Sequence, residues 1–222
     1  MRVVSWNVRS LRDDAAGVAR VIRSLSPDVV LVQEAPRLWR WRSKCARLAR
    51  ESGLVVVTGG RPAAGNLVMC AMRVRVASSY DVLLPKRPGL HRRGAATAVL
   101  ELDGRPLSVL GTHLDLDAAA RLDSAQRLRA QDYDVIGADL NEEPGNPAWN
   151  ALSVGMVDVS EGLPPTFSVA SPRRRIDAIF VGPSLRAVSC EVVDCGPVSD
   201  HKPIVADLEW TPGGRGPGRA RG

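Results

Sequence analysis

The spacing of apolar residues predicts two strands and two helices in the first quarter of the chain. Residues 2–6 and 28–32 are short apolar stretches, and the second is continuous, as in a strand buried on both faces of a sheet. Between them, residues 15–25 carry an apolar side chain at every third or fourth position, which is the period of an amphipathic helix. A second stretch with this helical period covers residues 38–49 and ends near Gly53.

From residue 54 onward, the period changes to that of β-strands. Five successive strands are predicted at residues 54–58, 66–72, 75–83, 95–102 and 107–112. They are followed by a helix at 118–130, a strand at 133–138, a short helix at 147–152 and two or three final strands up to Trp210. Strands near both ends, helices between them and a meander in the middle predict an α/β domain of two packed mixed sheets with outer helices.

The composition fits a single globular domain. The chain has 222 residues, of which 45% are hydrophobic, and this is enough to bury a substantial core in one domain over residues 1–210. Residues 211–222 are rich in Gly, Pro and Arg without apolar anchors, and we expect them to be disordered. The net charge of +6 suits a polyanionic partner, although 27 arginines against 3 lysines also indicate a general compositional bias.

Cysteine spacing and hydropathy argue against two classes of protein. The four cysteines form no Cys-x-x-Cys pair, so a zinc knuckle is not expected. No apolar run approaches the roughly 18 residues of a membrane span. Because Met1 leads directly into a predicted core strand, we expect no signal peptide and a cytoplasmic location.

The most informative stretch is residues 137–141, where the predicted strand 133–138 ends. Asp139 and Asn141 lie two positions apart, and side chains at this spacing in an extended chain point to the same side. A carboxylate and an amide therefore converge at the strand end, where loops commonly carry chemistry. Taken alone, the pair is equally compatible with an Asx turn that caps the strand.

Polar residues flank five other predicted strands in the same manner. They are Asn7 after residues 2–6, Glu34 after 28–32, His113 and Asp115 after 107–112, Asp177 before 178–181, and Asp200 with His201 before Ile204. Turn chemistry alone does not account for six such strand ends. Oxygen ligands favour a hard cation such as Mg²⁺. Glu34 is the best first ligand, because a carboxylate that ends a buried strand is otherwise costly.

The segments WN, QE, THLD, GADLN, RRID and SDHKP, in this order, resemble the endonuclease/exonuclease/phosphatase superfamily, the metal-dependent phosphodiesterases related to pancreatic deoxyribonuclease. The resemblance extends from Arg2 to about Trp210. It implies a four-layer α/β/β/α sandwich of two mixed sheets flanked by helices. It further implies Mg²⁺-dependent hydrolysis of phosphoesters, with Mn²⁺ as an alternative cation, and a monomer, the common state of relatives.

The resemblance implies which residues bind the metal and the attacking water. Glu34 would hold the metal, with Asn7 as a neutral oxygen ligand or a support beside it. Asp200 is a candidate ligand of a second metal or of water. Asp139 would orient or deprotonate the attacking water, and Asn141 would hold a phosphate oxygen.

A second group is expected to contact the substrate phosphate. By the resemblance, His201 would contact the scissile phosphate while Asp177 hydrogen-bonds its ring, and such a partner raises the pKa of a histidine. His113 would contact the phosphate or the leaving group. Arg93 stands where several relatives place a phosphate-contacting arginine. Arg9 replaces the acidic residue of close relatives among DNA-repair nucleases, which puts a second acidic metal contact in doubt and makes Arg9 a candidate phosphate ligand.

Three functions are compatible with these residues. The leading interpretation is a Mg²⁺-dependent nuclease that acts on DNA or RNA with limited sequence preference. The alternative is a lipid or sugar phosphodiesterase or phosphomonoesterase on the same scaffold, and a non-catalytic nucleic-acid-binding module is disfavoured because every motif residue is present. Residues 165–175 contain a single aromatic residue, Phe167, so a pocket for a flipped sugar has little support. The run 173–175, three arginines, predicts a basic rim.

Overall fold

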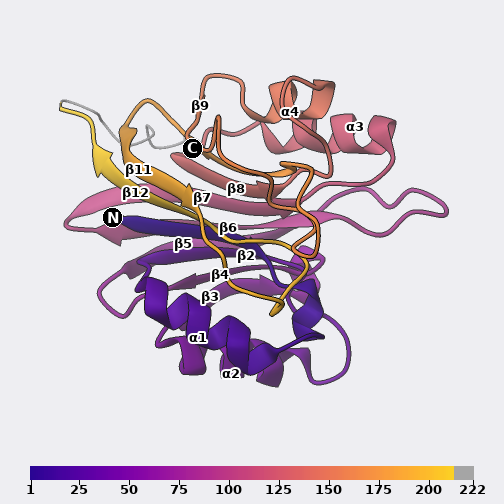
Figure 1. Ribbon diagram of the computed structural model, residues 1–222. Coiled ribbons are helices and arrows are strands. Elements are labelled where there is room, and N and C mark those ends of the chain that lie inside the picture. The colour runs from indigo at the N-terminus through magenta and orange to yellow at the C-terminus, as the bar shows by residue number, and fades with distance from the viewer. Residues whose placement is uncertain (213–222) are drawn as a thin grey trace.

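The computed structural model describes residues 1–212 and has four layers, with two β-sheets packed face to face between two pairs of helices (Figure 1). The first sheet has the strand order β11-β12-β1-β2-β4-β3. Its strands are β1 (Arg2–Asn7), β2 (Val29–Gln33), β3 (Val55–Gly60), β4 (Asn66–Cys70), β11 (Leu185–Val192) and β12 (Ile204–Trp210). Helices α1 (Ala15–Leu25) and α2 (Trp41–Ser52) cover its outer face (Figure 1).

The second sheet has the strand order β5-β6-β7-β8-β10-β9. Its strands are β5 (Arg75–Leu83), β6 (Gly94–Leu102), β7 (Arg105–His113), β8 (Val135–Asp139), β9 (Val157–Asp158) and β10 (Asp177–Val181). Helices α3 (Ala118–Leu128) and α4 (Pro147–Leu152) lie on its outer face. In each sheet one pair of strands is parallel, β1 with β2 and β7 with β8, and the other pairs are antiparallel. The expected sandwich of two mixed sheets is confirmed.

Three apolar layers hold the sandwich together. Val29, Leu31 and Ile179 belong to the cluster between the two sheets, where aliphatic side chains dominate. Trp6 lies in the cluster that joins the first sheet to α1 and α2. Phe180 lies in the cluster beneath α3 and α4, where the Trp149 ring meets it edge-on at a centroid distance of 5.6 Å.

Local signals in the sequence account for most helix boundaries, and one predicted boundary was wrong. Asp14 caps α1 by accepting a hydrogen bond from the backbone N–H of Gly17 at 2.8 Å, and Gly53 ends α2 in the left-handed conformation. However, α2 begins at Trp41 rather than near Leu38, because Arg40 has a φ of 54° and interrupts the helical backbone. Leu38 is therefore outside the helix and is 76% exposed.

The two-residue strand β9 was not predicted, since Val157 and Asp158 are too few to establish a period. We expected disorder at residues 211–222, and residues 213–222 of this segment lie outside the described residues. Within residues 1–212, no helix has the length and apolar character that crossing a bilayer requires.

The two sheets approach each other closely at Gly137 on β8. A Cβ atom at this position would lie 2.7 Å from Leu31 Cδ1 and 2.9 Å from Ser5 Oγ, both of which belong to the opposite sheet. Gln33 spans the same gap and donates from Nε2 to the Gly137 carbonyl oxygen at 3.3 Å. Gly137 therefore keeps the ends of β1, β2 and β8 within reach of one another.

We expect Gly137→Ala to lower the free energy of unfolding by roughly 1–3 kcal/mol, the range for overpacking a core. Gly111→Ala is the matched control, because a Cβ on this β7 residue would meet Leu31 at an ordinary contact distance of 3.5 Å. Urea denaturation of both variants measures the difference. Equal destabilisation by the two substitutions would contradict the close approach at Gly137.

Candidate active site

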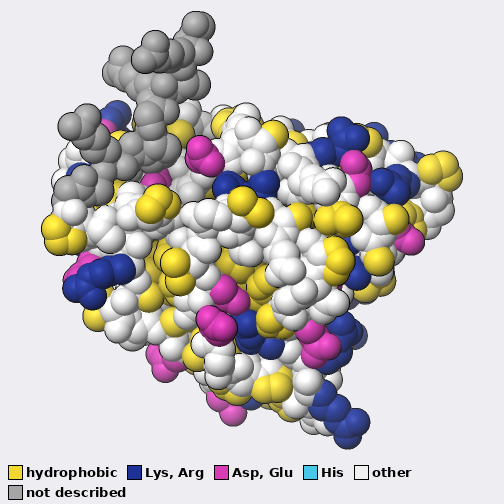
Figure 2. Space-filling view, turned by 90° about the horizontal axis from the view of Figure 1, so that it is seen from above, with side chains coloured by type: hydrophobic (Ala, Val, Ile, Leu, Met, Phe, Trp, Pro, Cys, Tyr) yellow, Lys and Arg dark blue, Asp and Glu magenta, His cyan; other side chains and the backbone are white. Residues whose placement is uncertain are grey.

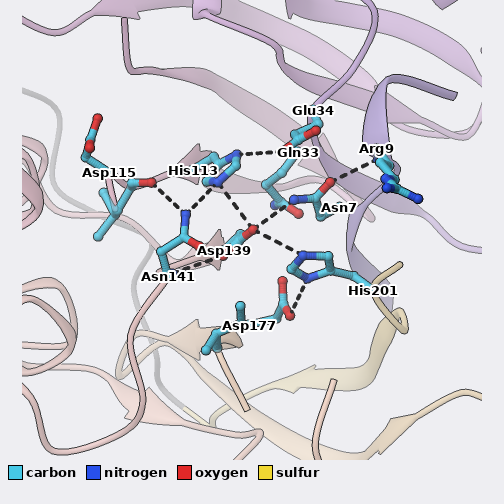
Figure 3. A network of polar contacts seen from close by, with 12 residues as sticks. Asn7, Arg9, Gln33, Glu34, His113, Asp115, Asp139, Asn141, Asp177 and His201 are labelled. Atoms are coloured by element: carbon cyan, nitrogen blue, oxygen red, sulfur yellow. Dashed lines mark hydrogen bonds and ion pairs between the residues drawn. The ribbon is translucent and has the colours of Figure 1, made fainter. Parts of the chain in front are cut away.

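Strand register places the candidate residues at one edge of the sandwich. The parallel strands β1 and β2 end together at Asn7 and Gln33, which are register partners. In the second sheet, Asp139 is the register partner of both His113 on β7 and Asp177 on β10. Because the two sheets pack face to face, five strand ends deliver their polar side chains to one place (Figure 3).

Asp139 lies at the centre of this group and is 1% exposed. Its Oδ2 accepts a hydrogen bond from Asn7 Nδ2 at 2.8 Å, and its Oδ1 accepts one from the backbone N–H of Asn141 at 3.0 Å. Burial disfavours the charged carboxylate, but His113, His201 and these hydrogen bonds outweigh that cost and lower the Asp139 pKa. Asp139 is therefore an anion with a fixed orientation.

His201 is held as a cation on one side of Asp139. Burial opposes its charged form, but the carboxylates of Asp177 and Asp139 outweigh burial and raise the His201 pKa to about 10. Its Nδ1 lies 2.9 Å from Asp177 Oδ2, and its Nε2 lies 3.7 Å from Asp139 Oδ2. Burial also raises the Asp177 pKa, so the pair retains a proton, and we place it on His201 because two carboxylates face this ring.

Contacts on every side fix the position of His201. Its backbone carbonyl accepts a hydrogen bond from Trp6 Nε1 at 2.8 Å, and the Phe167 ring packs against the imidazole at a centroid distance of 4.7 Å. Thr166 Oγ1 donates to Asp177 Oδ2 at 2.6 Å and so orients the carboxylate behind the ring. Thr166 and Phe167 precede the RRID segment, and no motif or spacing in the sequence indicated their positioning role.

His113 lies on the other side of Asp139 and is neutral. Burial lowers its pKa to about 4, although the Asp139 charge acts in the opposite direction. Asn141 Nδ2 donates to the Leu114 carbonyl oxygen at 3.0 Å. His113 Nε2 lies 2.8 Å from Asn141 Nδ2 and 3.3 Å from Asp139 Oδ2, and its Nδ1 faces Glu34 Oε1 at 3.8 Å.

A cleft of about 620 Å³ opens above these residues. Glu34 and Asp200 line it, together with Arg93 and both histidines of the site. Glu34 has a φ of 51°, a strained conformation for a non-glycine residue that turns the chain directly after β2. Asp200 Oδ2 lies 3.3 Å from Arg9 Nε, which places Arg9 at the mouth of the cleft.

Both arginines expected to contact phosphate have carboxylate partners. Arg93 Nε lies 3.3 Å from Asp115 Oδ2, and both side chains are largely buried. Arg9 pairs with Asp13 and Asp200. Contact with a substrate phosphate stays a prediction for both arginines. For Arg9, this contact would require that a phosphate replace one of its carboxylate partners.

The donor set fits a hard divalent cation. Glu34, Asp139, Asp177 and Asp200 supply carboxylate oxygens, the ligands that Mg²⁺ prefers. Within the described residues, Asp177 Oδ1 and Asp200 Oδ1 are buried without a hydrogen-bond partner. Asp139, Asp177 and His201 also bring three ligand atoms within 4.8 Å of one another. A histidine that coordinates a metal must be neutral, whereas His201 is cationic in the metal-free protein. In that state the three side chains therefore form an ion-pair network rather than a set of metal ligands.

One prediction on the rim of the cleft was wrong. Arg175 does not extend the basic rim, because it is buried and its guanidinium group lies 3.0 Å from Asp158 Oδ2 and 4.7 Å from the Trp149 ring. Arg173 and Arg174 are exposed, and Arg174 lines the cleft. His91, which belongs to none of the motifs, also lines the cleft.

Comparison with known proteins places this fold and site in a family. The model of the Endonuclease/Exonuclease/phosphatase family matches residues 4–201, which include every candidate residue named above. The chain belongs to this family. This match confirms the resemblance inferred from the sequence motifs. Endonuclease/exonuclease/phosphatase proteins are hydrolases of phosphoester bonds. A search of curated proteins found no match.

Solved structures of the family share the fold over nearly the whole chain. An endonuclease/exonuclease/phosphatase protein from Bacteroides vulgatus has a TM-score of 0.80 at 23% identity, covering 95% of this chain and 98% of that one. A mannosyl-6-phosphatase from Bacteroides thetaiotaomicron has a TM-score of 0.80 at 18% identity, with 95% and 100% covered. TDP2 from D. rerio, in complex with a single-stranded DNA product, has a TM-score of 0.76 at 20% identity, with 94% and 98% covered. At these identities, the likeness establishes the fold alone.

Proposed function

We propose that the protein is a Mg²⁺-dependent phosphodiester hydrolase that acts on nucleic acid. The observation that carries this proposal is the charge pattern around Asp139. A buried, oriented carboxylate lies between a cationic His201 and a neutral His113, on the floor of a cleft lined by Glu34 and Asp200. Pairs of titratable groups whose pKa values are driven apart by their surroundings are typical of acid–base catalysis.

Each side chain has a chemical task in this proposal. Asp139 accepts the proton of the attacking water, because it is ionised and its orientation is fixed. His201 donates from Nε2 to a non-bridging phosphate oxygen and stabilises the charge of the transition state, while Asp177 holds its ring. His113 is neutral and can donate its ring proton to the phosphate or the leaving oxygen. Asn141 positions His113, and its amide also donates to the Leu114 carbonyl oxygen.

Glu34 and Asp200 would hold the cation, and Asn7 would support it. When bound, Mg²⁺ supplies electrostatic stabilisation of the charge on the phosphoryl oxygens. In the metal-free protein Asn7 Oδ1 accepts a hydrogen bond from the backbone N–H of Arg9 at 3.0 Å, so its established contact is the one that orients Asp139. We also propose that residues 1–210 form the catalytic domain and that the protein acts as a cytoplasmic monomer.

Nucleic acid is favoured as the substrate because several cations at the cleft are not neutralised. Arg12, Lys44 and Arg174 line the cleft, and none of them has a carboxylate partner among the described residues. Several unpaired cations around one cleft suit a substrate with more than one phosphate. A sugar monophosphate would need only the central contacts.

The substrate test is a parallel assay of plasmid DNA, RNA, an abasic duplex, a phospholipid panel and a sugar phosphate, each with Mg²⁺, with Mn²⁺ and with a chelator. We expect nicking of plasmid or degradation of RNA that requires the divalent cation and stops when it is removed. Turnover of only the phospholipid or only the sugar phosphate would support phosphoesterase activity and contradict the proposed nuclease activity. Absence of any turnover with either cation would favour a binding module.

A further inference from the structure

A second hollow of about 540 Å³ adjoins the cleft, and we call it the side hollow. Four arginines from four segments line it, namely Arg37 after β2, Arg42 on α2, Arg61 after β3 and Arg92 before β6. None of the motifs in the sequence includes these residues. The catalytic groups described above do not line this hollow either.

The side hollow is strongly basic, because no acidic residue lines it. None of its four arginines has a carboxylate partner among the described residues, whereas arginines elsewhere on the surface are commonly paired, such as Arg20 with Asp14 and Arg47 with Glu51. On the face seen in Figure 2, acidic side chains lie among the basic ones. Four guanidinium groups without carboxylate partners around one concavity favour the binding of an anion.

Packing fixes one wall of the side hollow. The Trp41 ring packs directly on Gly60, where an added Cβ would lie 2.5 Å from the ring. The Arg42 guanidinium lies over the same ring, 4.5 Å from its centroid. A planar apolar surface beside guanidinium groups suits a ligand that carries both an aromatic base and a phosphate.

The side hollow and the cleft are continuous. Arg37, Leu38 and Ala64 line both of them. Each hollow has the size of a small-molecule site, which commonly measures about 300–1,000 Å³. A ligand that fills both must carry anionic groups at two separated points.

We propose that the side hollow binds the phosphodiester backbone that flanks the scissile phosphate of a single-stranded nucleic acid. This inference rests on the proposed function, because it takes the cleft as the site of the reacting phosphate. A linear polyanion can occupy two adjoining concavities, whereas the flat surface of a membrane cannot enter them. The arginines would bind phosphates without reading base sequence, in agreement with limited sequence preference.

The experiment measures binding in the absence of cleavage. A fluorescein-labelled single-stranded 12-mer is titrated with protein in EDTA, and fluorescence anisotropy gives the dissociation constant at several salt concentrations. The double variant Arg61→Ala/Arg92→Ala removes two exposed arginines of the side hollow. Its matched control is Arg23→Ala/Arg50→Ala, which removes two exposed arginines that line neither hollow and have no carboxylate partner among residues 1–212.

We expect the side-hollow variant to bind the 12-mer on the order of tenfold more weakly, the scale of one charge-assisted hydrogen bond. The slope of log K against log[salt] should decrease by roughly 0.7 for each arginine removed, as for phosphate contacts to a single strand. The control should keep the wild-type affinity and slope, because its arginines line neither hollow. Both doubles change the net charge equally, so a general charge effect would lower both affinities alike.

Three results would overturn this inference. Equal losses in both double variants, or no loss in either, would show that the side hollow has no specific part in strand binding. Binding to vesicles that contain anionic phospholipid is titrated in parallel, and a loss confined to these vesicles would assign the hollow to a lipid headgroup instead. Mg²⁺-dependent hydrolysis of the same 12-mer by the wild type is measured separately, so failure of the proposed nuclease activity is distinguishable from failure of this inference.

Discussion

Asp139→Asn should abolish nearly all hydrolysis, with a loss of about 10²–10⁴ in rate, the scale of a removed general base. The amide cannot accept the proton of water at neutral pH. It also conflicts with its surroundings, because Asn7 Nδ2 and the backbone N–H of Asn141 both donate to the carboxylate, and an amide offers only one oxygen. Initial rates at saturating Mg²⁺ measure the loss, and circular dichroism verifies that the variant is folded.

The matched control for this prediction is Asp134→Asn. Asp134 is likewise buried and directly precedes β8, but it accepts hydrogen bonds from the backbone and side chain of Ser108 at 2.8 and 2.9 Å, remote from the cleft. We expect Asp134→Asn to reduce stability while the turnover of the folded protein stays near that of wild type. Asp139 would lose its assigned role if its variant kept more than a tenth of the rate, or if both variants lost activity equally.

His201→Gln should remove a pH-dependent part of the folding free energy. The His201 pKa rises from the ordinary histidine value of 6.5 to about 10 in the folded protein. A raised pKa contributes stability that is fully present below pH 6.5 and is lost as the pH rises toward 10. Across this window, the unfolding free energy of the metal-free wild type should decrease by at most about 1.4 kcal/mol for each pH unit relative to the variant.

The comparison with the variant is necessary because other groups titrate just above and just below this pH range. Burial raises the pKa of Cys45, Cys190 and Cys195 to about 11, so each thiol also withdraws stability at alkaline pH. Below pH 6.5, His113 withdraws stability, because the folded protein resists its protonation. Urea denaturation of both proteins in EDTA between pH 6.5 and 8.5 isolates His201. Parallel curves in that range would refute the raised pKa.

Hydrolysis provides an independent test of the same histidine. Because His201 keeps its proton up to about pH 10, wild-type turnover should not fall between pH 7 and 9 through loss of this cation. His201→Gln should lower turnover by about 10²-fold, the scale of a lost acid–base group, at every pH in this range. A wild-type profile that collapses near pH 7 would point to an ordinary imidazole.

The sequence was sufficient to predict the fold because several kinds of local signal agreed. The continuous apolar run at residues 28–32 corresponds to β2, which is shifted by one residue, and the helical period at residues 15–25 matches the bounds of α1. Strand ends with polar residues predicted the elements that surround Asp139. The failures have local causes as well: Leu38 continues the apolar period of α2, but the backbone of Arg40 stops the helix before reaching it.

Side-chain partners across the fold could not be predicted from the sequence. Arg175 belongs to a run of three arginines, yet it alone turns inward, because Asp158 and the Trp149 ring lie within its reach. Asn141 is used to hold His113, which depends on the Leu114 carbonyl of a neighbouring strand end. The side hollow combines arginines that are far apart in the sequence, so no spacing rule could find it.

The position of β1 has a consequence for biosynthesis. This first strand pairs with β2 on one side and with β12, the last strand, on the other, where Arg2 is the register partner of Asp207. His201 directly precedes β12, and its ring must reach Asp139 across the sandwich. A nascent chain therefore cannot complete the first sheet or assemble the catalytic group while the segment up to Trp210 is still inside the ribosome. Activity is withheld until translation of the domain has finished.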